Sequence, residues 1–249
     1  MKWDAKLYNA KHSFVYNYGE SLIELLNPIL NERILDLGCG TANLTKQISD
    51  KTKNIVGIDS SLDMVLSAQK QYPELEIYHE DATNFNFDEP FDAIFSNATL
   101  HWVLNYESCA KSMFRNLNSN GRIVVEFGGK GNVQLIIESL RKHLSSYNYL
   151  EQSKLKQWYF PSIGDYSQAL EKVGFRVTFA QHYDRLTELN ENGIKDWIEM
   201  FGKNFLENVK EEHKLEILDK VQEELRPELF KSGKWYADYK RIRIIAIKE

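Results

Sequence analysis

The stretch Ile34-Leu35-Asp36-Leu37-Gly38-Cys39-Gly40-Thr41-Ala42-Asn43 is the part of this chain that decides its fold class. An apolar segment runs into an acidic residue and two glycines, and helix-forming residues follow directly. Glycine lacks the Cβ atom that would keep a ligand at a distance, so the backbone N–H groups of such a loop can approach a bound group closely. The stretch therefore predicts a strand, a ligand-binding loop and a helix.

Two features separate this loop from a dinucleotide-binding fingerprint. The pattern G-x-G-x-x-G requires a glycine where Asn43 stands. Asp36 lies two residues before the first glycine. Its carboxylate can contact a positively charged ligand group there, whereas a loop that binds a pyrophosphate would avoid an acidic residue. Taken alone, the ten residues also fit a tight strand-to-helix turn of any α/β protein.

The composition limits the classes of protein that the chain can represent. Its 249 residues suit one elaborated α/β domain, and a formal net charge of −5 argues against a nucleic-acid-binding face. The two cysteines form neither a metal-binding spacing nor a disulfide framework. No apolar run is long enough to cross a bilayer, and the first residues lack a secretory signal core, so we expect a cytoplasmic protein without a membrane partner.

Strand-like and helix-like patterns alternate along the chain. Five expected strands, separated mostly by helical patterns, span residues 33–37, 54–58, 75–78, 91–95 and 122–127. Two more are expected at 175–179 and 241–247, the last of them antiparallel. The alternation predicts an α/β fold with a doubly wound, mostly parallel seven-stranded sheet and helices on both faces. Helical patterns at 131–160 and 186–232 are expected as cap insertions within a single domain, 1–249.

Polar residues stand at the ends of the expected strands, where open parallel sheets bind ligands. Asp59 ends the second strand nineteen residues after Gly40, and its carboxylate can accept hydrogen bonds from both hydroxyls of a ribose. Ser60 can help to cap the next helix, and Met64 can pack on a purine. The remaining strand-end residues are Glu80-Asp81-Ala82-Thr83 and Ser96-Asn97-Ala98-Thr99-Leu100-His101-Trp102. Purely structural roles remain open for three of these residues. Asp59 could cap a helix, Asp81 could stabilise a turn, and His101 could be a histidine packed in the core.

The order and spacing of these residues resemble the motifs of class I S-adenosylmethionine (SAM) methyltransferases. The residues that carry the resemblance are Asp36, Gly38, Gly40, Asp59, Asp81 and Asn97. It implies SAM as the cofactor, with the glycines near the methionine moiety, Asp59 on the ribose, Asp81 and Ala82 at the adenine edge and Asn97 near the reactive end. Ala42 replaces the third glycine usual in this motif, and its methyl group either crowds the cofactor or faces the helix.

A narrower resemblance is to trans-aconitate methyltransferases and their small-molecule relatives. It rests on Phe95-Ser96-Asn97-Ala98-Thr99-Leu100-His101-Trp102-Val103 and on Phe160-Pro161-Ser162, and it covers roughly residues 3–185. It implies that residues 1–30 form a helical lid, with Tyr8 and His12 contacting the cofactor.

These observations together predict a SAM-dependent methyltransferase acting on a small molecule, with a carboxylate oxygen as one expected acceptor atom. The sulfonium methyl group is already activated, so neither a metal nor a covalent nucleophile is required. The catalytic candidates are Asn97 and His101, and the acceptor-binding candidates are His101, Lys130, Tyr159, Arg185, Trp197, Tyr239 and Arg241. A nicotinamide-dependent oxidoreductase and a SAM-binding module without catalysis remain as alternatives. We expect no nucleic-acid partner, and a monomer or a homodimer.

Overall fold

The computed structural model of the chain describes residues 14–249, and of residues 14–18 and 20 it describes the backbone only. The predicted roles of Tyr8 and His12, and the first thirteen residues of the predicted lid 1–30, therefore lie outside the described residues. The described chain divides into two compact units. Unit 1 holds the chain up to Gly129 together with Pro161–His182 and Ile242–Glu249, and unit 2 holds Lys130–Phe160 and Tyr183–Arg241.

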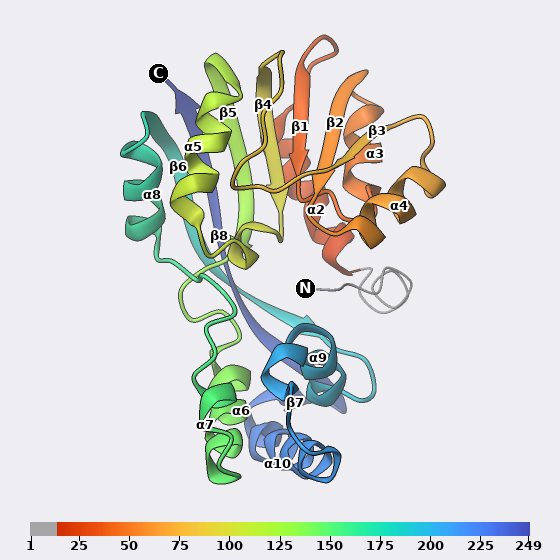
Figure 1. Ribbon diagram of the computed structural model, residues 1–249, viewed down its shortest axis with the longest axis vertical. Helices are drawn as coiled ribbons and strands as arrows, with labels where there is room; N and C mark the ends of the chain where they lie inside the picture. Colours follow the sequence, from red (N-terminus) through yellow and green to blue (C-terminus); the bar gives the residue numbers. More distant parts are fainter. Residues whose placement is uncertain (1–13) are drawn as a thin grey trace. The chain divides into compact units, whose positions relative to one another are not determined.

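The sheet of the protein has the strand order β3-β2-β1-β4-β5-β8-β6, seven strands on one path as the sequence predicts (Figure 1). Its strands are β1 (Arg33–Leu37), β2 (Asn54–Asp59), β3 (Glu76–His79), β4 (Phe91–Asn97), β5 (Leu117–Gly128), β6 (Phe175–Glu188) and β8 (Lys234–Lys248). The short β7 (Phe230–Lys231) pairs with β8 off this path. Strand β1 pairs in parallel with both β2 and β4, so the direction of winding reverses at β1. Such a reversal opens a crevice at the carboxyl ends of the strands.

The helices of unit 1 flank this sheet (Figure 1). They are α2 (Phe14–Leu26), α3 (Asn43–Ser49), α4 (Leu62–Gln71), the short 3-10 helix η1 (Leu100–Trp102), α5 (Tyr106–Arg115) and α8 (Ile163–Glu171). Residues Leu22 and Leu26 of α2 and Ile48 of α3 are fully buried against strand residues such as Ile34 and Phe95. This apolar contact holds the glycine loop between β1 and α3 on a rigid base.

Local sequence signals mark several helix ends as expected. Ser162 and Asp165 form a reciprocal capping box at the start of α8. Gly174 follows α8 with a φ of 105°, a backbone conformation that glycine adopts without a steric penalty. Ser61 caps α4 by accepting a hydrogen bond from the N–H of Met64.

Three strands are longer than the sequence predicts. Strand β6 continues to Glu188 and β8 begins at Lys234, where the predicted strands end at 179 and begin at 241. Most side chains of β6 are exposed or half-buried, so these residues lack the apolar alternation on which the prediction depends. Strand β5 begins at Leu117 rather than at the predicted residue 122, and its pairing with β4 is irregular between Phe91 and Ala93.

Unit 2 is mainly helical and contains both predicted cap insertions. Its helices are α6 (Gln134–Ser146), α7 (Leu150–Ser153), α9 (Ile194–Phe201), the 3-10 helix η2 (Lys203–Leu206) and α10 (Glu211–Leu229). Glu224 of α10 accepts hydrogen bonds from Ser139 of α6 at 2.9 Å and from Lys142 at 2.7 Å, which joins these two helices. None of the helices described in residues 14–249 has the length and apolar character needed to span a bilayer.

Candidate active site

Backbone hydrogen bonds hold the glycine loop against the neighbouring strand. The N–H groups of Gly38 and Cys39 both donate to the carbonyl oxygen of Ile58 in β2, at 2.8 and 2.9 Å. The N–H of Gly40 donates to Oδ2 of Asp59 at 2.9 Å. Gly38 and Gly40 have φ angles of 79° and 57°, in the left-handed region that favours glycine. The conformation of the loop is therefore fixed by its two glycines and by the hydrogen bonds to β2.

Asp59 is held by two backbone donors and faces a cavity. Its Oδ1 accepts from the N–H of Ser61 at 2.8 Å, while Oδ2 accepts from Gly40. Burial raises the pKa of Asp59 above its usual value, and the two backbone donors act in the opposite direction. Each carboxylate oxygen retains a lone pair beyond these bonds, so the group can still accept from the two hydroxyls of a ribose.

A cavity of about 260 Å³ opens at the carboxyl ends of β1, β2 and β4. Of the predicted cofactor residues, Gly38, Asp59, Ser60, Asp81 and Ala82 line it. It is also lined by residues that the sequence analysis did not single out as cofactor contacts, namely Leu37, Ile58, Glu80, Thr83, Thr99, Trp102, Val103, Leu104 and Asn105. The residues after β4 could have been found from the sequence, because their loop follows the carboxyl end of a strand, as the predicted cofactor residues do.

Asp81 forms the turn that the sequence left as one alternative, and it also lines the cavity. Its Oδ1 accepts hydrogen bonds from both the N–H and the hydroxyl of Thr83, each at 2.7 Å, which is a turn-forming arrangement. The same residue lines the cavity, and Oδ2 of its carboxylate is available for an amino group.

Asp36 lies beneath the loop rather than in the lining of this cavity. Its side chain is 2% exposed, and its Oδ2 accepts a hydrogen bond from the hydroxyl of Thr45 at 2.6 Å. Burial raises the pKa of Asp36 to about 7, and the nearby Asp59 charge acts in the same direction. Gly40, Met64 and Asn97 also lie outside the cavity lining, and Met64 is 4% exposed.

His101 is a buried ring whose protonation pattern is set by a backbone donor. The N–H of Gly128 in β5 lies 3.4 Å from Nδ1 of His101 and donates to it. A backbone N–H is always a donor, so Nδ1 acts as the acceptor and the ring proton sits on Nε2. The ring also packs against Trp102, with centroids 5.4 Å apart. His101 is therefore arranged as a hydrogen-bond donor through Nε2.

The other acceptor-binding candidates belong to unit 2. Trp197 donates from Nε1 to the hydroxyl of Tyr239 at 2.7 Å, and burial raises the pKa of Tyr239 to about 12. Arg241 is 5% exposed, and its charge acts on the Tyr239 hydroxyl. Lys130 is exposed and Tyr159 is half-buried. Arg185 donates to the hydroxyl of Tyr183, and its guanidinium lies 5.2 Å from the centre of that ring.

The fold and the cavity define an α/β protein with a ligand-sized cavity at the carboxyl ends of parallel strands. Comparisons with known proteins agree. Residues 35–125 match the family described as the methyltransferase domain. An uncharacterised methyltransferase of Schizosaccharomyces pombe is 31% identical over 99% of this chain and 98% of its own length. A crystal structure from Bacillus halodurans C-125, assigned as a methyltransferase, superposes with a TM-score of 0.65 at 18% identity, covering 92% of this chain and 97% of its own.

The chain belongs to the class I SAM-dependent methyltransferases, and SAM is its cofactor. The predicted family, fold class and cofactor are thereby confirmed, and the nicotinamide-dependent alternative is excluded. A trans-aconitate 2-methyltransferase of Escherichia coli is 31% identical over a shorter region, which spans 50% of this chain and 50% of that protein.

The cavity fits the charge of this cofactor. Its lining includes three carboxylates, those of Asp59, Glu80 and Asp81. Carboxylates suit ribose hydroxyls and the exocyclic amino group of adenine, and they repel the phosphates of a dinucleotide. Among the side chains that the structure describes, no group of three or more His, Cys, Asp or Glu residues is placed to hold a metal ion.

Proposed function

We propose that this enzyme methylates a carboxylate oxygen of a small-molecule acid. The proposal concerns the acceptor alone, since the methyltransferase class and the cofactor follow from the family. Bound SAM supplies a methyl group on a positively charged sulfur, which an acceptor nucleophile can displace. The remaining tasks of the protein are to hold the acceptor, align it and exclude water.

The observation that carries the proposal is the state of His101. A histidine can accept a proton on Nε2 as a neutral base only when its existing ring proton is on Nδ1. In this protein Nδ1 accepts from the N–H of Gly128, so His101 can serve as a base only by losing that bond. A carboxylic acid needs no base, because its unperturbed pKa of about 4 leaves it deprotonated at neutral pH. A donor at Nε2 can instead help to hold a carboxylate.

Two further observations support an acidic acceptor. The E. coli relative that matches half of this chain is named for an acid, trans-aconitate. Unit 2 also combines a buried cation, Arg241, with the aromatic residues Trp197 and Tyr239. Arginine binds carboxylates with paired hydrogen bonds, and the aromatic rings offer an apolar wall. Within unit 2 we propose these three residues as acceptor-binding candidates, with Lys130, Tyr159 and Arg185 as secondary candidates. His101 of unit 1 is a separate candidate.

The test is a panel of acceptors assayed for release of S-adenosylhomocysteine from SAM. The panel should contain dicarboxylic and tricarboxylic acids, fatty acids, phenols and primary amines at equal concentration. We expect turnover with acids, and the Asp59→Ala variant, purified in the same way, controls for a contaminating methyltransferase. Activity confined to amines or phenols would overturn the carboxylate proposal and leave the methyltransferase class intact.

A further inference from the structure

Side chains at the end of β4 and just after it form hydrogen bonds with the glycine loop, from the side opposite β2. Ser96, which is fully buried, donates from its hydroxyl to the carbonyl oxygen of Leu37 at 2.7 Å. The hydroxyl of Thr99 lies 3.1 Å from the carbonyl oxygen of the next residue, Gly38, and 3.2 Å from that of Asn97. Two successive carbonyls at the start of the loop are thus bonded to side chains of the neighbouring strand end.

The chain adopts a strained turn that brings Thr99 to this position. Ala98 has a φ of 57°, a left-handed conformation that is sterically unfavourable for a residue with a Cβ. Its N–H donates to the carbonyl oxygen of Glu126 in β5 at 2.7 Å, which holds the turn in place. Backbone strain of this kind persists where the surrounding structure enforces it, and it gathers at functional sites.

Thr99 and Gly38 are also in close steric contact. A Cβ atom added to Gly38 would lie 2.1 Å from Cγ2 of Thr99 and 2.2 Å from its hydroxyl oxygen. Two constraints therefore favour glycine at position 38, namely the close contact with Thr99 and the positive φ of 79°. Thr99 lines the cavity beside Gly38, so any movement of the loop into the cavity is limited by this side chain.

We propose that Thr99 is a positioning residue for the cofactor, which fixes the orientation of the Gly38 peptide before SAM arrives. The N–H groups of Gly38 and Cys39 are bonded to Ile58, and the Thr99 hydroxyl bonds the Gly38 carbonyl, so the peptide is held on both sides. A loop that is ordered beforehand loses less conformational entropy on binding, and this increases affinity. The inference concerns SAM alone and does not depend on the identity of the acceptor.

The experiment compares three variants by calorimetric titration with SAM, in the absence of any acceptor. Thr99→Val keeps the shape of the side chain and removes the hydroxyl. We expect it to weaken SAM binding by about 5- to 20-fold, because the Gly38 carbonyl loses this donor. Thr99→Ser keeps the hydroxyl, and it should bind SAM within about 3-fold of the unchanged protein.

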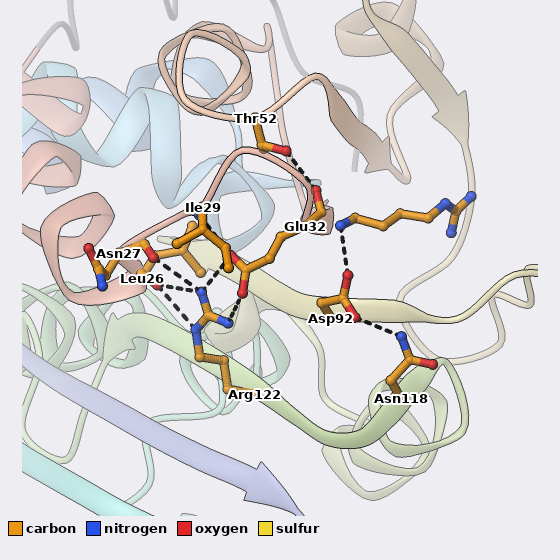
Figure 2. Close-up of polar contacts among 9 residues, drawn as sticks. Leu26, Asn27, Ile29, Glu32, Thr52, Asp92, Asn118 and Arg122 are labelled. Carbon is orange, nitrogen blue, oxygen red and sulfur yellow. Dashed lines mark hydrogen bonds and ion pairs between the residues drawn. The ribbon is translucent and has the colours of Figure 1, made fainter.

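Thr52→Val is the matched control. The Thr52 hydroxyl is buried and also lies near two carbonyls, those of Glu32 at 2.6 Å and Leu30 at 3.2 Å, at the opposite end of β1 (Figure 2 shows its contact with Glu32). We expect Thr52→Val to lower the melting temperature while leaving SAM affinity unchanged. The proposal is overturned if Thr99→Val binds SAM normally, if Thr99→Ser is as weak as Thr99→Val, or if Thr52→Val weakens SAM binding equally.

Discussion

At the scale of single residues, the most unusual group in the loop region is the Asp36 carboxyl. It is buried, bonded to Thr45, and its pKa is raised to about 7. Its value in the unfolded chain is near 3.8, so between these two pH values the folded protein binds a proton that the unfolded chain has released. Stability therefore falls as the pH rises from about 4 to about 7, and the loss is complete above that range.

Asp36→Asn should remove this pH dependence, because the amide does not titrate and its oxygen can still accept from Thr45. Relative to the unchanged protein, we expect the variant to gain about 2 kcal/mol of unfolding free energy between pH 5 and pH 8. Denaturant unfolding of both proteins without SAM, at several pH values, measures the difference. Parallel stability curves across this range would contradict the buried, raised-pKa state of Asp36.

The orientation of the Ala42 methyl group could not be predicted from the sequence. With alanine in place of the usual glycine, the methyl group could either crowd the cofactor or face the helix. In the structure Ala42 is fully buried with a φ of 63° and packs with Val65, Ala68 and Ile77, so the methyl group faces the core beside α4. The left-handed conformation costs about 1 kcal/mol, and burying the methyl group returns about 0.8 kcal/mol. Alanine is therefore tolerated at a position where glycine is usual.

At the scale of elements, the end of α2 is fixed by Arg122 of β5. Its Nε and Nη2 atoms donate to the carbonyl oxygen of Leu26, the last residue of the helix, at 3.1 and 2.7 Å (Figure 2). Its Nη2 also donates to the Glu32 carboxylate at 2.9 Å, and the pKa of Glu32 lies below its usual value although burial alone would raise it. The guanidinium thus satisfies a helix-end carbonyl and a carboxylate together.

Arg122→Met should lower the unfolding free energy by about 1–3 kcal/mol, because it leaves the Leu26 carbonyl and the Glu32 carboxylate without this donor. Arg176→Met is the control, since Arg176 pairs with Glu249 where both side chains are more than half exposed. Exposed pairs contribute little, so this variant should change stability by less than about 0.5 kcal/mol. Equal losses in the two variants would show that Arg122 acts as an ordinary surface charge.

The elements that could be predicted from the sequence are those with an apolar period. Strands β1, β2 and β4 carry buried residues at most positions. The ends of β1 and β2 bring Gly38 and Asp59 to the lining of one cavity. The extension of β6 lacks such a period, because most of its side chains are exposed or half-buried. The extension of β8 buries Trp235 and Ala237 two residues apart, a short alternation that the predicted strand at 241–247 leaves out. The hydrogen bond from Thr99 to the Gly38 carbonyl could not be predicted either, because it joins residues that are 61 positions apart in the sequence.

At the scale of the whole molecule, the two units hold different parts of the predicted chemistry. The residues that line the cofactor cavity all belong to unit 1, whereas Arg241, Trp197 and Tyr239 belong to unit 2. The sequence motifs are local and therefore identified the cofactor residues in unit 1. The proposed acceptor-binding residues of unit 2 share no such local motif, so the identity of the acceptor could not be derived from the sequence.

The central claim is that the cavity at the ends of β1, β2 and β4 binds SAM through Asp59 and the glycine loop. Calorimetric titration of SAM and of NAD⁺ into the unchanged protein, Asp59→Ala and Asp63→Ala tests it most directly. Asp63 is the control, because it is an exposed aspartate four residues further along, in the first turn of α4 and outside the cavity lining.

We predict that the unchanged protein and Asp63→Ala bind SAM equally and do not bind NAD⁺. Asp59→Ala should bind SAM about ten- to a hundred-fold more weakly, because it loses charge-assisted hydrogen bonds to the ribose and the tether of Gly40. Circular dichroism would verify that each variant is folded. Unchanged SAM affinity in folded Asp59→Ala, or tighter binding of NAD⁺ than of SAM, would contradict the account.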